Sequence, residues 1–236
     1  MNLLKRTIIK YIQKYNRRLN TAYLENFYQI NYLDMARRTD WLKVIPLSSP
    51  SGGTASFSLL YILLMILSDR NNSKLMEIGV GQSTKLLMQY AEEFNDELVL
   101  LDDNQYWLNT VVGENTVATS IYSELVSKTV CNHDIRWYKV SPPNFRFDFL
   151  LIDGPMAYTK DMKYNRLGVL DWIPDILDDD FIIIVDDSGR TGESLLVQKL
   201  MNKLKHFNIS IKSKEIVGAN TQTIIATSKY YKYLYL

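Results

Sequence analysis

Glycines and carboxylates follow four apolar segments of the sequence, and their spacing limits the chemistry that they can perform. Residues 77–84 (E-I-G-V-G-Q-S-T) follow the first segment, and Gly79 and Gly81 would let the backbone turn tightly and approach a ligand. Asp102 ends the second segment, 21 residues beyond Gly81. An acid at that distance can accept hydrogen bonds from both hydroxyls of a ribose. This pattern predicts a site for a ligand that contains a nucleoside.

Two further segments end in acids. Asp153 lies in I-D-G-P, and Asp186 and Asp187 lie in V-D-D-S-G-R. Carboxylates that gather without partners raise one another's pKa and reduce stability, so proteins tend to keep them for a metal, a base or a bound cation. The ordinary alternative is that these acids cap helices or are polar strand ends.

Two nucleoside ligands fit a G-x-G followed by an acid, namely a dinucleotide and S-adenosylmethionine. The dinucleotide fingerprint is G-x-G-x-x-G, and Thr84 stands where its third glycine would be. The E-x-G-x-G pattern fits S-adenosylmethionine better, and a dinucleotide remains the less favoured ligand.

Alternation of short apolar runs with helical spacing indicates the elements that must position these residues. Such alternation predicts an α/β fold, a doubly wound Rossmann-like sheet that is mostly parallel and ends in an antiparallel hairpin. The G-A-N segment between the last two runs is the hairpin signal. The expected strands are 74–79, 98–101, 120–130, 135–140, 147–152, 181–185, 209–217 and 221–227, and the expected helices are 55–68, 83–94 and 195–207.

Composition excludes several classes of protein. The 236 residues are 47% apolar and 22% charged, as in an ordinary globular chain. A formal net charge of +1 argues against nucleic acid as a partner. One cysteine excludes an internal disulfide, and with two histidines there is no Cys/His cluster for zinc. Carboxylates are therefore the available chemical groups.

Charge is concentrated at the start of the chain. Residues 1–20 carry +6 and the remainder −5, and apolar residues recur in the first segment at helical spacing. We interpret it as an amphipathic helix that docks on the domain, or as one that attaches to an anionic membrane surface. Residues 55–68 are apolar but shorter than the roughly 20 residues of a spanning helix, so we expect a buried helix with its N-cap in the loop 48–54.

The sequence resembles the class I S-adenosylmethionine-dependent methyltransferases over roughly residues 54–228. L-M-E-I-G-V-G-Q-S-T resembles the glycine-rich first motif of that family, L-L-D-D-N-Q-Y-W the second, and F-D-F-L-L-I-D-G-P the fourth strand. Ser83 replaces the usual third glycine of the first motif. The chain most resembles a branch with D-G-P, then an arginine, then D-D-x-x-R-x-x-E, which is similar to plant glucuronoxylan methyltransferases and to proteins of bacterial polysaccharide gene clusters.

The resemblance implies a role for each matching residue. The catalytic residues would be Asp153, Asp187 and Arg190. The cofactor-binding residues would be Glu77, Gly79, Gly81, Ser83 and Asp102. A divalent cation, if used, has Asp153, Asp186 and Asp187 as candidate ligands. Arg166 and Glu193 would bind substrate, with Arg166 and Arg190 either clamping an acidic sugar or phosphate or forming internal salt bridges to the acids.

The function implied is S-adenosylmethionine-dependent O-methyl transfer, with a sugar or glycan hydroxyl as the acceptor. A non-catalytic methyltransferase-like subunit of a polysaccharide assembly complex is the alternative. We expect a helical extension over residues 1–45 and a methyltransferase-like domain over 46–236. We also expect a cytoplasmic location, with residues 1–20 as a candidate peripheral contact at the inner face of the membrane.

Overall fold

The computed structural model describes residues 3–47, 55–70, 73–113 and 117–235, with side chains described from Leu19 onward. The helices are α1 (Leu3–Arg37), α2 (Phe57–Leu67), α3 (Gln82–Phe94), α4 (Gln105–Val112) and α5 (Thr191–His206), with 3₁₀ helices η1 (Asn165–Asp171) and η2 (Ser228–Tyr235). The strands are β1 (Lys74–Ile78), β2 (Glu97–Asp102), β3 (Ala118–Tyr122), β4 (Leu125–Val130), β5 (His133–Tyr138), β6 (Phe147–Ile152), β7 (Leu177–Val185), β8 (Ile211–Val217) and β9 (Thr221–Thr227).

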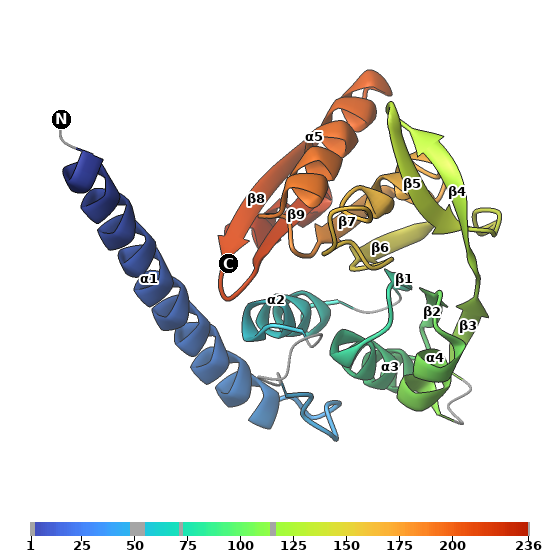
Figure 1. Cartoon of the computed structure of the whole chain (residues 1–236). Helices are drawn as coiled ribbons and strands as arrows, with labels where there is room; N and C mark the ends of the chain where they lie inside the picture. The colour runs from blue at the N-terminus through green and yellow to red at the C-terminus, as the bar shows by residue number, and fades with distance from the viewer. Residues whose placement is uncertain (1–2, 48–54, 71–72, 114–116, 236) are drawn as a thin grey trace.

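Seven strands form one sheet in the order β3-β2-β1-β6-β7-β9-β8 (Figure 1). The first five are parallel, and β9 runs antiparallel to both β7 and β8. The predicted fold class, including the terminal antiparallel hairpin, is confirmed. Because the parallel strands share one direction, all of their carboxyl ends meet at one edge of the sheet.

Both faces of the sheet are covered by buried apolar side chains. Within β2, Leu98 and Leu100 join the core beneath α1 to α4, while Val99 and Leu101 join the core beneath β5, η1 and α5. This period of two is the strand period, and continuous apolar runs are what a sheet buried on both sides requires. The central strands are therefore held rigidly from both sides.

The predicted strand 120–130 is wrong in one respect. It is two strands that belong to different sheets, since β3 pairs with β2 whereas β4 pairs only with β5. The chain turns between β4 and β5 at Cys131 and Asn132, whose φ angles are 50° and 62°. Two consecutive positive φ angles are those of the tight hairpin turn that follows strand twist. The strand predicted at 135–140 is thus confirmed as β5, in a separate two-stranded sheet.

Helix α2 is almost wholly buried, as its apolar sequence predicts. Its N-cap is Ser56, whose Oγ accepts a hydrogen bond from the Leu59 amide at 3.2 Å. The expected cap in residues 48–54 lies outside the described residues. None of the described helices is both long enough and apolar enough to cross a membrane.

Helix α1 lies along one side of the molecule and packs on α2 through its C-terminal half (Figure 1). Tyr32 is fully buried there, and its hydroxyl donates to the Pro46 carbonyl at 2.8 Å. Glu25 accepts hydrogen bonds from two backbone amides, those of Phe57 and Ala219. The helix expected at the start of the chain is present, and it extends to Arg37. The proposed boundary between residues 45 and 46 stays a prediction.

Candidate active site

A cavity of about 580 Å³ opens where β1, β2, β6 and β7 end. Seven of the predicted site residues line it: Gly79, Asp102, Asp153, Arg166, Asp186, Asp187 and Arg190. Glu77, Gly81, Ser83 and Glu193 are not part of its lining. The topology therefore brings residues from four strand ends to one place, as the parallel sheet predicts.

Gly79 occupies a position that only glycine fits. Its φ is +93°, and a Cβ built on it would lie 2.5 Å from the backbone nitrogen of Gly154. Gly154 is equally constrained, because its own Cβ would lie 2.6 Å from the Gly79 Cα. The two loops after β1 and β6 thus touch backbone to backbone at the wall of the cavity.

Glu77 shapes the glycine loop from behind. It is fully buried, and its carboxylate accepts hydrogen bonds from the hydroxyls of Ser83 and Thr84 in the first turn of α3. The Thr84 hydroxyl oxygen also accepts a hydrogen bond from the Gly81 amide at 2.8 Å. Burial raises the pKa of Glu77 to about 7, although the two hydroxyls oppose that shift. Glu77 and Ser83 thus hold the loop in place, and their role in cofactor binding stays a prediction.

Asp102 connects two loops at the cavity wall. Its Oδ2 accepts a hydrogen bond from the Val80 amide at 2.8 Å, and its Oδ1 accepts one from the Asn104 amide at 2.7 Å. Burial raises its pKa in spite of these bonds. Each carboxylate oxygen has a second lone pair, so the group can still accept hydrogen bonds from a ligand. Trp107 closes this end of the cavity, and its Nε1 donates to the Val80 carbonyl at 2.6 Å.

Asp153, Asp186 and Asp187 converge at the same cavity, with one oxygen from each within 4.8 Å of the others. Arg166 lies among them. Its Nη2 is 3.0 Å from Asp153 Oδ1 and 3.6 Å from Asp187 Oδ2, and its Nη1 donates to the Asp186 carbonyl at 3.0 Å. Gln222 of β9 donates to Asp186 Oδ1 at 2.8 Å. One buried guanidinium thus pairs with two carboxylates and one backbone carbonyl from two strand ends.

The acids raise one another's proton affinity. Burial and the neighbouring Asp186 raise the pKa of Asp153 well above its usual range, while the Arg166 guanidinium opposes the shift. Burial and Asp186 likewise raise the pKa of Asp187 to about 6. A carboxyl group with a pKa of about 6, as in Asp187, exchanges protons closer to neutral pH than an ordinary surface acid does.

The two arginines differ in their exposure. Arg166 is buried, and besides its bonds to the aspartates its Nε lies 3.6 Å from Glu193, which is also buried. It therefore forms the internal salt bridges that were the alternative to a substrate clamp. The side chain of Arg190 is 40% exposed, and its Nη2 pairs with Asp187 at 2.8 Å. Of the two, Arg190 is the one that faces solvent at the cavity.

Several lining residues were not selected from the sequence. Trp107 lies within the quoted L-L-D-D-N-Q-Y-W motif, and Met156 and Tyr158 follow D-G-P closely. Asn220 belongs to the G-A-N turn between the last two strands. Trp107, Met156 and Tyr158 could have been selected because they lie close to a motif. Asn220 could not, because only the order of the strands in the sheet brings the last turn to this cavity.

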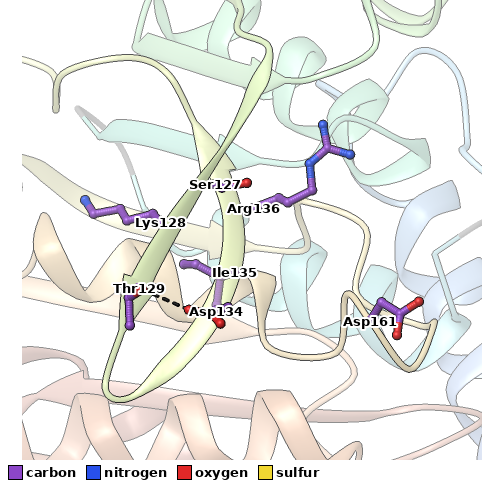
Figure 2. A pocket seen from close by; sticks show the side chains of 7 residues that line it. All are labelled: Ser127, Lys128, Thr129, Asp134, Ile135, Arg136 and Asp161. Atoms are coloured by element: carbon purple, nitrogen blue, oxygen red, sulfur yellow. Dashed lines mark hydrogen bonds between the residues drawn. The ribbon is translucent and has the colours of Figure 1, made fainter.

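A second hollow of about 460 Å³ lies on the β4–β5 hairpin and contains none of the predicted residues. Figure 2 shows Thr129 bonded to Asp134, while Lys128 and Arg136 point away from each other. Lys128 forms an ion pair with Asp171. These exposed side chains do not converge on one point, so the cavity at the strand ends is the candidate active site.

No protein-family model and no curated protein matches the chain. Several solved structures do match it. A methyltransferase from Pyrococcus furiosus has 15% identity and a TM-score of 0.50, and the match covers 84% of this chain and 96% of that one. An O-methyltransferase from Bacillus cereus in complex with SAH has 14% identity, a TM-score of 0.47, and coverage of 89% and 99%. The precorrin-6y C5,15-methyltransferase from Geobacter metallireducens has 13% identity, a TM-score of 0.48, and coverage of 76% and 92%.

The chain is therefore similar in fold to the methyltransferase from Pyrococcus furiosus, and the fold of the resemblance stated above is confirmed. The narrower likeness to the glucuronoxylan and polysaccharide-cluster branch stays a prediction.

Proposed function

We propose that this protein is an S-adenosylmethionine-dependent O-methyltransferase that acts on a hydroxyl group of a sugar or glycan. One observation carries the proposal: the glycine loop with Asp102 and the cluster of Asp153, Asp186 and Asp187 line the same cavity. The first set suits a nucleoside, and the second suits a hydroxyl that must lose a proton.

The methyl donor fits the end of the cavity formed by Gly79, Asp102 and Trp107. Asp102 has lone pairs for the ribose hydroxyls, and the indole of Trp107 is half-exposed beside it. The donor supplies a methyl group that is already activated by the positive charge on sulfur. The protein therefore has mainly to align donor and acceptor.

A sugar acceptor fits beside the methyl donor. Tyr158 and Met156 are exposed at the cavity and offer an apolar surface, while Arg190 and Asn220 offer polar groups beside it. A pyranose ring has an apolar face and a polar rim, so this mixture of side chains suits it.

Asp153 is the proposed general base. Its raised pKa makes it a stronger base than an ordinary carboxylate, and Arg166 orients it through the 3.0 Å bond to Oδ1. In the proposed step the acceptor hydroxyl gives its proton to Asp153 as its oxygen bonds to the methyl carbon. The carbon–sulfur bond breaks at the same time, its electron pair stays on sulfur, and the positive charge disappears. Asp187, with a pKa of about 6, is the second candidate base.

The same acids suit a hard divalent cation. Asp153, Asp186 and Asp187 supply oxygen ligands within 4.8 Å of one another, which is the donor type that magnesium prefers. With Glu193 they make four carboxyl groups beside the two guanidinium groups of Arg166 and Arg190, and a divalent cation would stabilise the ionised forms of these acids. A bound cation would lower the pKa of an acceptor hydroxyl. Dialysis against EDTA with add-back of Mg²⁺ tests this part of the proposal.

Binding of S-adenosylmethionine and S-adenosylhomocysteine by calorimetry is the first test of function. Transfer of tritiated methyl groups to soluble glycans, with and without uronic acid, is the second. An active protein binds both nucleosides and labels a glycan. If it binds neither, the non-catalytic subunit of a polysaccharide assembly complex becomes the better assignment.

Replacing Asp153 with Asn is expected to slow methyl transfer by roughly 10² to 10⁴ fold, the usual contribution of a general base. Binding of S-adenosylhomocysteine should change little, because Asn keeps the size of the side chain. Steady-state kinetics and calorimetry measure the two effects. A variant with the normal rate would remove Asp153 from the role of base.

A further inference from the structure

The exposed face of α1 carries an apolar stripe. Leu19, Tyr23, Phe27 and Ile30 are 51%, 73%, 49% and 69% exposed. They are spaced by four, four and three residues, which places them on one side of a helix with 3.6 residues per turn. Large apolar side chains that gather on one exposed face of a protein usually mark a contact surface.

The opposite face of α1 is already in use. Tyr32 and Ala36 are buried against the domain, Tyr28 packs on Tyr61 of α2, and Glu25 binds the amides of α2 and of the last hairpin. The apolar stripe therefore cannot turn inward without breaking these contacts. What covers it must come from outside the described part of the chain.

Charge decides which partner fits. Residues 1–20 carry six basic residues and no acidic one, and these six, from Lys5 to Arg18, lie on the same helix immediately before the stripe. Residues 21–40 carry a net charge of −1. A second copy of the chain paired along α1 would place +6 against +6 or against −1, which leaves most of the charge uncompensated. A surface of anionic lipid headgroups compensates it directly.

We propose that α1 is an interfacial helix that lies on an anionic membrane surface, with Leu19, Tyr23, Phe27 and Ile30 inserted among the headgroups. Tyr and Phe suit this boundary, since aromatic side chains favour the interface between water and hydrocarbon. The contact extends beyond the basic segment to residue 30. The surface acts in addition to the cavity, and it does not depend on the proposed methyl transfer.

Co-sedimentation of the full chain with lipid vesicles tests the proposal. One set is phosphatidylcholine alone, and the other contains about 30% phosphatidylglycerol as the anionic lipid. We expect binding to the anionic vesicles at low salt, little binding to phosphatidylcholine, and release as salt screens the charges. The double variant Tyr23→Glu/Ile30→Glu should bind about tenfold more weakly or worse, because it inserts charge where apolar groups enter the bilayer.

The matched control is Asn202→Glu/Ser127→Glu, which adds the same two charges at exposed positions on α5 and β4. It should bind like the wild type. Both variants change exposed residues, and melting temperatures confirm that they fold. Absence of binding to anionic vesicles, or equal binding by the stripe variant, would overturn the proposal. So would a dimer in sedimentation equilibrium that the stripe variant dissociates, since a second copy would then be the partner.

Discussion

Asp102 has a structural role and, in the proposed complex, a role in ligand binding, and the effect of replacing it should reflect both. In the protein it accepts hydrogen bonds from two backbone amides, and in the proposed complex it also accepts hydrogen bonds from the ribose hydroxyls. Asp102→Ala is therefore expected to weaken S-adenosylhomocysteine binding by about tenfold or more, and to lower the melting temperature because two amides lose their acceptor. Calorimetry and thermal unfolding measure the two effects. The control is Asp103→Ala; if that variant alone lost affinity, the ribose contact would belong to Asp103.

At the scale of single residues, the sequence predicts which side chains gather at one cavity, but not which groups each side chain contacts. Strand ends and acidic residues suffice to bring Asp102, Asp153 and Asp187 to one cavity, because a parallel sheet gathers its carboxyl ends. Glu77 belongs to the same motif, yet its carboxylate is bonded to hydroxyls of α3. Glu77 lies within β1, and its partners are set by where the following loop places the first turn of α3, which the residue types alone do not determine.

The loop between β1 and α3 shows how an element depends on one residue. Gly79→Ala is expected to destabilise the fold by about 2 kcal/mol or more, because its Cβ would collide with the Gly154 backbone and its φ is positive. Gly81→Ala is the matched control. Its Cβ would meet nothing closer than 4.0 Å, so the cost should stay below about 1 kcal/mol. Denaturant unfolding compares the two variants, and equal losses would show that the two loops do not touch as described.

Elements were predictable where the apolar pattern is long. The runs that became β1, β6 and β7 and the helical spacing of α3 were found correctly. The division of 120–130 into β3 and β4 was not, because an alternating pattern continues through the break and periodicity does not tell which sheet a strand joins. Helix α4 was likewise not predicted as an element, since its eight residues are too few for a clear period.

The whole molecule should be more stable in mild acid than in weak base. The pKa values of Glu77 and Asp187 are raised from 4.5 and 3.8 to about 7 and about 6. The folded protein therefore holds protons that the unfolded chain has already released. The stability that these protons contribute is complete below the unfolded pKa values and is lost as the pH rises through the folded ones.

Melting temperatures between pH 5 and pH 8 measure this dependence. Glu77→Gln removes one titrating group and should flatten the dependence of stability on pH. The raised pKa of Glu77 accounts for roughly 3 kcal/mol of the stability that is lost as the pH rises. A variant whose stability falls with pH as steeply as that of the wild type would show that Glu77 does not carry a raised pKa.

Glu25 also has a consequence for how the chain is made. It binds the amide of Ala219 at 2.7 Å, across 194 residues of sequence. Synthesis starts at the N-terminus, so α1 leaves the ribosome long before the last hairpin exists to receive it. Until that hairpin is complete, one of the two amides that Glu25 binds is missing, whereas Phe57 of α2, on which Tyr32 packs, is made soon after α1. The packing of α1 on α2 can thus form early, and the contact between Glu25 and the last hairpin is added only when synthesis nears its end.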